Sequence, residues 1–113
     1  MDDVIRSLAA VIEQRRSEPQ EGSYTCYLFD KGLDKILKKC GEECTEMVIA
    51  AKNLDGSAAA RQAFAGEVAD LVYHVLVLMA ERGVPLAAVE EILAARSAKI
   101  GNLKQFHASD HNT

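Results

Sequence analysis

Two short acidic clusters stand in segments that are otherwise rich in apolar residues: Glu42-Glu43-Cys44-Thr45-Glu46 and Glu67-Val68-Ala69-Asp70. Residues three apart share one face of a helix, so Glu43 pairs with Glu46, and Glu67 pairs with Asp70. If the two helices are antiparallel neighbours, both pairs face one space, where two carboxylates in contact repel by roughly 4 kcal/mol at an effective dielectric of about 20. The pattern therefore predicts a cation between the clusters.

The donor set indicates which cation this is. Four carboxylates without histidine or cysteine partners suit a hard divalent ion, and Mg²⁺ commonly keeps bound water while it joins carboxylates to substrate phosphates. We therefore expect Mg²⁺, or Mn²⁺ in its place, to be bound by Glu43, Glu46, Glu67 and Asp70. Di-iron bundles carry Glu-x-x-His on paired helices. Here the corresponding spacings end in Glu46 and Asp70, which disfavours redox chemistry.

The alternative is that these acids form ordinary solvated helix faces. Glu42 fits that alternative, because Lys38 and Lys39 lie within one turn of it. Glu67 and Asp70 do not, since neither has Lys or Arg three or four residues away. The spacing thus favours a metal site over a solvated surface.

Basic and aromatic side chains border the acidic face. Lys35 and Lys39 lie beside it on the same helix and can receive phosphate oxygens, which suggests hydrolysis of a phosphorylated nucleotide. His74 falls on one arc with Glu67 and Asp70. That histidine is equally compatible with a contact to the metal shell or substrate and with a hydrogen-bonded place in the core.

Helical periodicity predicts the elements that position these residues. The chain has 113 residues, seven glycines, two prolines and no tryptophan, which indicates one all-α domain with a modest core. We expect four helices, over residues 2–16, 26–54, 58–82 and 85 to about 97–100, with a polar connection over 17–22. Ser23 or Thr25 can cap the second helix, Asp55-Gly56 can stop it, and Ser57 can cap the third.

The second and third helices differ in how much apolar surface they carry. The second has one stripe, formed by Phe29, Leu33, Ile36, Cys40, Cys44, Met47 and Ala51. Within it, Gly41 either allows something to approach closely or merely kinks the helix. The third helix is apolar around most of its circumference, as expected at the centre of a bundle or at a subunit interface. We therefore expect a four-helix, bundle-like protomer that is completed by dimerisation.

Charge and composition exclude several classes of protein. The formal net charge is −4 and the basic residues are scattered, so nucleic acid is not an expected partner. We find no apolar stretch approaching the ~20 residues that span a bilayer and no leader-like N-terminus, so we expect a soluble, cytoplasmic protein without membrane contact. The odd count of three cysteines predicts reduced thiols, with Cys40 and Cys44 in packing roles. Residues 101–113 are expected to form a flexible tail after a domain over residues 1–100.

Longer motifs resemble a known family. They are Ser23-Tyr24-Thr25-x-x-Leu28-Phe29, Lys31-Gly32-x-x-Lys35-Ile36-x-Lys38-Lys39-x-Gly41-Glu42-Glu43-x-x-Glu46 and Glu67-x-x-Asp70-Leu71-x-Tyr73-His74. In this order they are similar to the phosphoribosyl-ATP pyrophosphohydrolases of histidine biosynthesis, which are MazG-like, all-α nucleotide pyrophosphohydrolases. The resemblance runs from the first helix to about Arg96.

The resemblance implies an activity and roles for individual residues. The expected reaction is hydrolysis of phosphoribosyl-ATP to phosphoribosyl-AMP and pyrophosphate, with Mg²⁺ on the four motif carboxylates. Glu42 would orient or deprotonate the attacking water together with Glu43 at the catalytic centre. Substrate contacts would come from Ser23, Thr25, Lys35, Lys39 and His74. Members of this group assemble from two or more chains, so the resemblance also implies a homodimer or a higher homo-oligomer.

Two other functions remain open from the sequence. The same site on a related enzyme would hydrolyse ordinary or damaged deoxynucleoside triphosphates as a house-cleaning activity. A helical interaction protein would instead carry these acids as a surface without catalysis. Assaying a panel of nucleotides distinguishes phosphoribosyl-ATP hydrolysis from the house-cleaning activity. Measuring thermal stability with and without Mg²⁺ or Mn²⁺ distinguishes an enzyme with a metal site from a helical interaction protein.

Overall fold

The computed structural model describes residues 3–101, and within them the protein is helical throughout. The helices are α1 (Val4–Ser17), α2 (Tyr24–Lys31), α3 (Leu33–Lys52), α4 (Ala58–Arg82) and α5 (Leu86–Gly101). No strand occurs in this part of the chain, which confirms the all-α prediction. The predicted tail lies outside the described residues, apart from Gly101 at the end of α5.

Local signals set the ends of most helices where the sequence places them. The Asp3 carboxylate accepts from the Arg6 backbone N–H at the start of α1, and the Ser57 hydroxyl accepts from the Ala60 N–H at the start of α4. Gly83 ends α4 in the left-handed conformation, with φ of 72°. The first and third predicted helices are confirmed to within two residues at each end.

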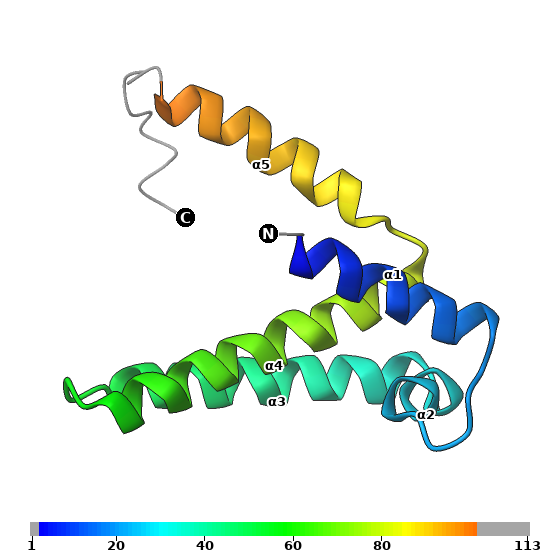
Figure 1. Ribbon diagram of the computed structural model, residues 1–113, viewed down its shortest axis with the longest axis horizontal. Coiled ribbons are helices and arrows are strands. Elements are labelled where there is room, and N and C mark those ends of the chain that lie inside the picture. The colour runs from blue at the N-terminus through cyan, green and yellow to red at the C-terminus, as the bar shows by residue number, and fades with distance from the viewer. Residues whose placement is uncertain (1–2, 102–113) are drawn as a thin grey trace.

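The predicted single helix over residues 26–54 is wrong. It is two helices, because Gly32 has φ of 92° and ψ of −175°, a conformation open almost only to glycine. The Gly32 N–H still donates to the Leu28 carbonyl, and the Gly32 carbonyl accepts from the Ile36 N–H, so backbone hydrogen bonds flank the sharp turn on both sides. The consequence is visible in Figure 1, where α2 is seen almost end-on beside the start of α3.

Helices α3 and α4 run antiparallel and side by side, and they form the longest contact in the protein (Figure 1). Helix α1 packs against the last turns of α4, and α2 closes the same end. The buried apolar residues are Ile12, Leu28, Ile36, Leu76, Val77 and Ala80. These come from α1, α2, α3 and α4, so four helices share one core at that end. The α3–α4 pair extends beyond this core and carries the acidic clusters along its length.

Helix α5 leaves the core after the Gly83-Val84-Pro85 turn and diverges from the other helices (Figure 1). Arg6 Nε, on α1, donates to Glu90 Oε2 over 2.8 Å. Beyond that contact the outer half of α5 is solvent-exposed, and Ile92 and Leu93 are 52% and 56% exposed. The predicted last helix therefore exists, but its apolar face packs on little of its own protomer.

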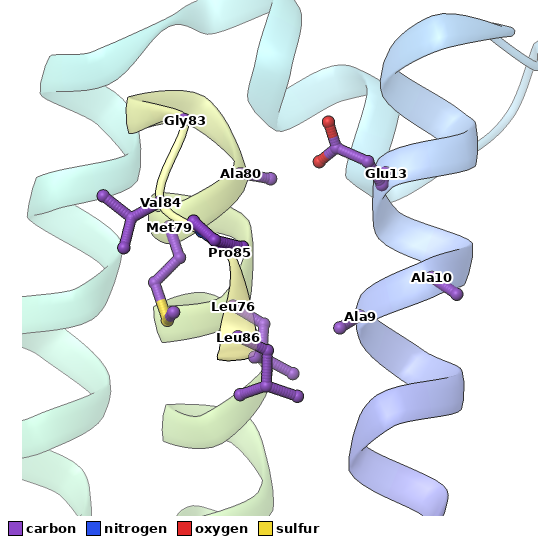
Figure 2. A pocket seen from close by; sticks show the side chains of 10 residues that line it. All are labelled: Ala9, Ala10, Glu13, Leu76, Met79, Ala80, Gly83, Val84, Pro85 and Leu86. Atoms are coloured by element: carbon purple, nitrogen blue, oxygen red, sulfur yellow. The ribbon is translucent and has the colours of Figure 1, made fainter. Parts of the chain in front are cut away.

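An apolar hollow of about 550 Å³ separates α1 from the turn between α4 and α5 (Figure 2). Figure 2 shows Ala9 on α1 facing Leu76, Pro85 and Leu86 across it. Glu13 is the one charged residue in its lining, and the acidic clusters take no part in it. This hollow therefore lies apart from the acidic clusters of α3 and α4.

Two sequence expectations about α4 and the cysteines need correction. Helix α4 is long and apolar enough to span a membrane by length and composition, with a mean hydropathy of 1.6 over 18 residues, of which only 17% are buried. The expectation that no stretch approached that length overlooked how few charges α4 carries. Cys44 is exposed rather than packed, whereas half-buried Cys40 donates to the carbonyl of His74. The three thiols are free, as predicted.

Candidate metal centre

Three carboxylates from the middle of α3 and α4 converge. Glu43 and Glu46 stand one turn apart on α3, and Glu67 faces them from α4 because the two helices pack antiparallel. One oxygen from each of the three lies within 4.8 Å of the others. The structure thus brings together three of the four predicted metal ligands.

The burial of these groups is the decisive feature of the cluster. Glu43 is only 6% exposed, and Glu67 is half-buried. Glu43 Oε2 and Glu67 Oε2 are both inaccessible and have no hydrogen-bond partner. A buried carboxylate oxygen without a partner costs several kcal/mol, on the order of the penalty for an unpaired buried charge. An all-oxygen donor set with this deficit fits a hard divalent cation.

Lys39 neutralises one side of the cluster. Its Nζ lies 3.5 Å from Glu43 Oε1 and 4.0 Å from Glu42 Oε2. Partial desolvation opposes the charged form, but Tyr24, Glu43 and Glu42 together outweigh it and raise the pKa of Lys39 above its ordinary value. Over residues 3–101, no ion pair reaches Glu46, Glu67 or Asp70. Lys39 therefore serves Glu43 and Glu42, and within the described residues Glu46, Glu67 and Asp70 have no ammonium or guanidinium partner.

Asp70 and Glu42 lie apart from the three converging oxygens. Asp70 is exposed on α4, one turn beyond Glu67, and its carboxylate is not part of the close group. Glu42 is exposed on α3, and its one recorded ionic contact is with Lys39. Lys35 is half-buried and forms no salt bridge within the described part of the chain. Their roles in the site stay predictions.

The predicted substrate contacts at the start of α2 are already engaged within the protein. The Ser23 hydroxyl caps α2 by accepting from the Cys26 N–H over 3.2 Å. The Thr25 hydroxyl forms a hydrogen bond with the Tyr73 hydroxyl. The capping alternative is therefore the one seen for Ser23, and Thr25 joins α2 to α4. A contact of either residue with substrate stays a prediction.

His74 lies in the core, which is one of the two places that the sequence allowed for it. It is 5% exposed, and its Nδ1 lies 2.7 Å from the Asp70 carbonyl oxygen. Since a carbonyl only accepts, Nδ1 carries the proton, and in that tautomer Nε2 accepts from the Tyr24 hydroxyl at 3.0 Å. Burial raises the pKa of Tyr24, which keeps that hydroxyl protonated as a donor.

Sequence reasoning named Tyr24 only within the Ser23-Tyr24-Thr25 motif, with no role of its own, and it did not name Asn53. Tyr24 is held by a residue fifty positions away, a pairing for which the sequence carries no local signal. Asn53 lines a pocket of about 320 Å³ that opens beside the carboxylates, together with Glu46, Ile49, Ala50, Ala60, Ala63 and Glu67. The signal for Asn53 was available, because it stands one turn after Ala50 and two turns after Glu46 on the same face.

A family profile described as phosphoribosyl-ATP pyrophosphohydrolase matches residues 5–97, which include every carboxylate of the cluster. The chain belongs to this family. The match spans all five helices, so it covers the fold and the acidic site together. It confirms the resemblance seen in the motifs.

Individual relatives agree with the family profile. A phosphoribosyl-ATP pyrophosphatase of Listeria monocytogenes is 52% identical over 101 residues, which cover 89% of this chain and 92% of that protein. Proteins of the same name from Streptococcus sanguinis and Clostridium botulinum are 53% and 50% identical over 98 and 103 residues. These alignments cover 87% of this chain and 89% of the Streptococcus protein, and 91% of this chain and 89% of the Clostridium protein.

Family membership decides between the classes of function left open by the sequence. The chain is a hydrolase of the phosphoribosyl-ATP pyrophosphohydrolase family, as predicted, and not a helical interaction protein without catalysis. The acidic cluster is correspondingly the candidate centre for phosphoryl chemistry.

Proposed function

We propose that this chain hydrolyses phosphoribosyl-ATP to phosphoribosyl-AMP and pyrophosphate, the second step of histidine biosynthesis, at the carboxylates of α3 and α4. The observation that carries the proposal is the pair of buried, unpartnered oxygens on Glu43 and Glu67. In a member of this family such a deficit of positive charge calls for a cation. The same residues would be an unexplained cost in a protein without a ligand there.

Mg²⁺, or Mn²⁺, is the proposed occupant, with Glu43, Glu46, Glu67 and Asp70 as its ligands. When bound, it would supply positive charge for the polyphosphate and acidify water. Asp70 lies one turn from Glu67 on α4, so a change of side-chain rotamer rather than of backbone would bring its carboxylate toward the cluster. Because Glu43 is buried, its carboxylate would form the side of the site that faces the protein interior.

The chain's other residues have distinct tasks in this proposal. Glu42 is exposed, so its carboxylate can take the proton of the attacking water. The water oxygen forms a bond to phosphorus while the bridge between the α- and β-phosphoryl groups breaks, and pyrophosphate leaves with the electron pair. Lys39 remains charged beside Glu43 and can pair with a phosphate oxygen, as can Lys35. Ser23, Thr25 and His74 would contribute at the phosphoribosyl end, directly or through Tyr24.

We further propose that the enzyme works as a homodimer or higher homo-oligomer in the cytoplasm. Helix α4 is apolar over most of its surface, yet only 17% of its most apolar 18 residues are buried within one protomer. The exposed apolar residues of α5 and the hollow beside α1 (Figure 2) add to the uncovered surface. A second copy would cover surface of this size better than water does.

The direct test is a substrate panel. Pyrophosphate release is measured with Mg²⁺ for phosphoribosyl-ATP and, at equal concentrations, for ATP and the four deoxynucleoside triphosphates. We expect kcat/KM for phosphoribosyl-ATP to exceed every other value by at least about 100-fold, because a nucleotide that leaves polar site groups unpaired is rejected by large factors. A preference for a deoxynucleoside triphosphate would instead support the house-cleaning activity.

A further inference from the structure

The three tyrosines of the chain gather in one cluster, and the chain has no tryptophan. The Tyr24 ring stacks on Tyr27 with centroids 6.0 Å apart and on Tyr73 with centroids 6.1 Å apart. Near-parallel rings at that separation are offset, so each neighbour covers only part of the Tyr24 ring. Tyr24 accordingly remains 46% exposed. A large aromatic surface is therefore open to solvent at the first turn of α2.

The Tyr24 side chain is held in a fixed position by buried groups. Its hydroxyl donates to His74 Nε2, the His74 ring meets it edge-on at 5.8 Å, and His74 Nδ1 is anchored on the Asp70 carbonyl. Because His74 is 5% exposed, this anchor is protected from competing water. A ring held in this way loses little conformational entropy when it binds a ligand.

This position lies next to the carboxylate site. Two hydrogen bonds connect the Tyr24 hydroxyl to the backbone of Asp70, one turn from Glu67. The charges of Lys39 and Glu43 also act on the Tyr24 hydroxyl, as expected if the ring borders the cluster. An exposed aromatic ring and the ammonium group of Lys39 thus adjoin the carboxylate cluster.

We propose that Tyr24 is the stacking platform for the purine base of the nucleotide, and that His74 is the residue that positions it. The assignment rests on the proposed function, which supplies a substrate with a purine and a polyphosphate. The base would lie on the Tyr24 ring while the polyphosphate extends over the carboxylates. A tyrosine ring accepts any purine by its face, so this contact contributes affinity for the base rather than the chemistry of cleavage.

Tyrosine fluorescence gives a direct binding test, because every tyrosine of the chain is in this cluster and tryptophan is absent. AMP and inorganic tripolyphosphate are titrated separately into the full chain with Mg²⁺. We expect AMP to quench the fluorescence and tripolyphosphate to leave it nearly unchanged. In Tyr24→Leu the quenching by AMP should disappear. Equal quenching by AMP in Tyr24→Leu and in the unchanged chain would overturn the proposal.

Steady-state kinetics separate the platform from a structural role. For Tyr24→Leu we expect KM for phosphoribosyl-ATP to rise by about 5- to 150-fold, the loss typical of one aromatic–base stack. Tyr24→Phe keeps the ring and loses the hydrogen bond to His74, so its KM should lie between those of Tyr24→Leu and the unchanged chain, and a KM equal to that of the unchanged chain would remove the positioning role of His74. The inhibition constant of tripolyphosphate should stay within about twofold in both variants. A parallel rise of that constant in Tyr24→Leu would show disruption of the whole site and overturn the assignment.

Tyr27→Leu is the matched control, since Tyr27 is 42% exposed on the same helix but makes its recorded ring contacts only with Tyr24 and Lys31. Its KM should change less than that of Tyr24→Leu, and an equal change would contradict the choice of Tyr24. Turnover of phosphoribosyl-ATP by the unchanged chain decides the proposed function. The ratio of the KM of each variant to the KM of the unchanged chain tests whether Tyr24 is the stacking platform.

Discussion

Single carboxylates in this protein are placed where stability alone would not put them. Glu67 has one oxygen that is buried without a partner, and no salt bridge within residues 3–101 reaches it. A buried acceptor left unpaired destabilises a fold by about 1–3 kcal/mol, more when it is charged. Such a group persists when function requires it, because natural proteins accept lower stability at their active sites.

Replacing Glu67 by Gln should therefore separate activity from stability. Without metal, we expect Glu67→Gln to raise the free energy of unfolding by about 1 kcal/mol, since it removes repulsion among three carboxylates. With metal at about 100 times its Kd, the unchanged chain should gain about 2.7 kcal/mol and the variant much less. Turnover of phosphoribosyl-ATP should fall by at least about 100-fold. Urea unfolding with EDTA or Mn²⁺, beside a turnover assay, measures all three quantities.

The control is Glu91→Gln, which removes an exposed carboxylate on α5, outside the cluster. It should leave turnover and the Mn²⁺ effect within about twofold of the unchanged chain. If Glu67→Gln keeps its turnover, Glu67 is not a part of the centre. If it keeps the full stabilisation by Mn²⁺, Glu67 is not a metal ligand.

Residue spacing predicted which acids gather but could not place every side chain. The projection put Glu43, Glu46 and Glu67 on facing surfaces because helix geometry is regular, and the structure brings them within 4.8 Å of one another. It also put Asp70 there, yet a projection gives only the direction of the Cα–Cβ bond and not the rotamer. The projection could not predict the contact between Tyr24 and His74, because these residues are fifty positions apart and meet only after the chain turns at Gly32.

At the scale of elements, the sequence predicted some helix boundaries and missed another. Asp3 and Ser57 begin helices, and Gly83 ends one. Each acts by contacts within a few residues, so boundaries of this kind can be predicted from the sequence. The break at Gly32 was missed because the apolar spacing of Phe29, Leu33 and Ile36 continues through it. A glycine inside a regular pattern is ambiguous between a tolerated helix residue and a stop.

Gly32 and Gly41 should respond oppositely to alanine. A Cβ would meet nothing within 4 Å at either position, so any effect comes from the backbone alone. At Gly32, φ of 92° is strained for alanine, and we expect a loss of about 1–3 kcal/mol. Gly41 is helical, and alanine there should gain about 1 kcal/mol. Urea unfolding of both variants measures the difference.

The outcome at Gly41 also decides an open question from the sequence. Outside the backbone of α3 itself, no atom of the described chain lies within 4 Å of where a Cβ would stand on this glycine, and α3 continues through it. If Gly41→Ala gains stability but loses turnover or assembly, the space beside Gly41 is used by substrate or by another chain. If it changes neither, the glycine is not required there.

The turn between α3 and α4 should make stability depend on pH in acid. Hydrogen bonds from the Ser57 side chain and backbone lower the pKa of Asp55 below its ordinary value of 3.8. A carboxyl whose pKa is lower when folded stabilises the fold above pH 3.8 and loses this contribution as pH falls through the folded pKa. Asp55→Asn should therefore show a flatter fall in stability below pH 3.8, measured by urea unfolding across that range. If the stability of Asp55→Asn falls below pH 3.8 as steeply as that of the unchanged chain, this role of Asp55 is wrong.

At the scale of the whole molecule, one protomer does not cover its own apolar surface. The predicted bundle holds only at the end where α1, α2, α3 and α4 share a core, and α5 projects away from it (Figure 1). The sequence predicted the uncovered surface of α4 because its apolar residues exceed what one partner helix can cover. It could not assign α5 to that surface, since an apolar stripe does not identify the chain on which it packs.

If α5 takes part in the assembly, charge on its apolar face should dissociate the protein. We expect sedimentation at micromolar concentration to give a homodimer or larger assembly, and Ile92→Glu with Leu93→Glu to shift it toward the monomer. Two charges buried in an interface cost several kcal/mol, enough for a change of 100-fold or more in Kd, at about 1.4 kcal/mol per factor of ten. Glu91→Lys is the control, because it changes charge on the adjacent position of α5 without touching either apolar residue. A monomer for the unchanged chain would refute the assembly, and a dimer that survives both glutamates would place its interface on α3 and α4 instead.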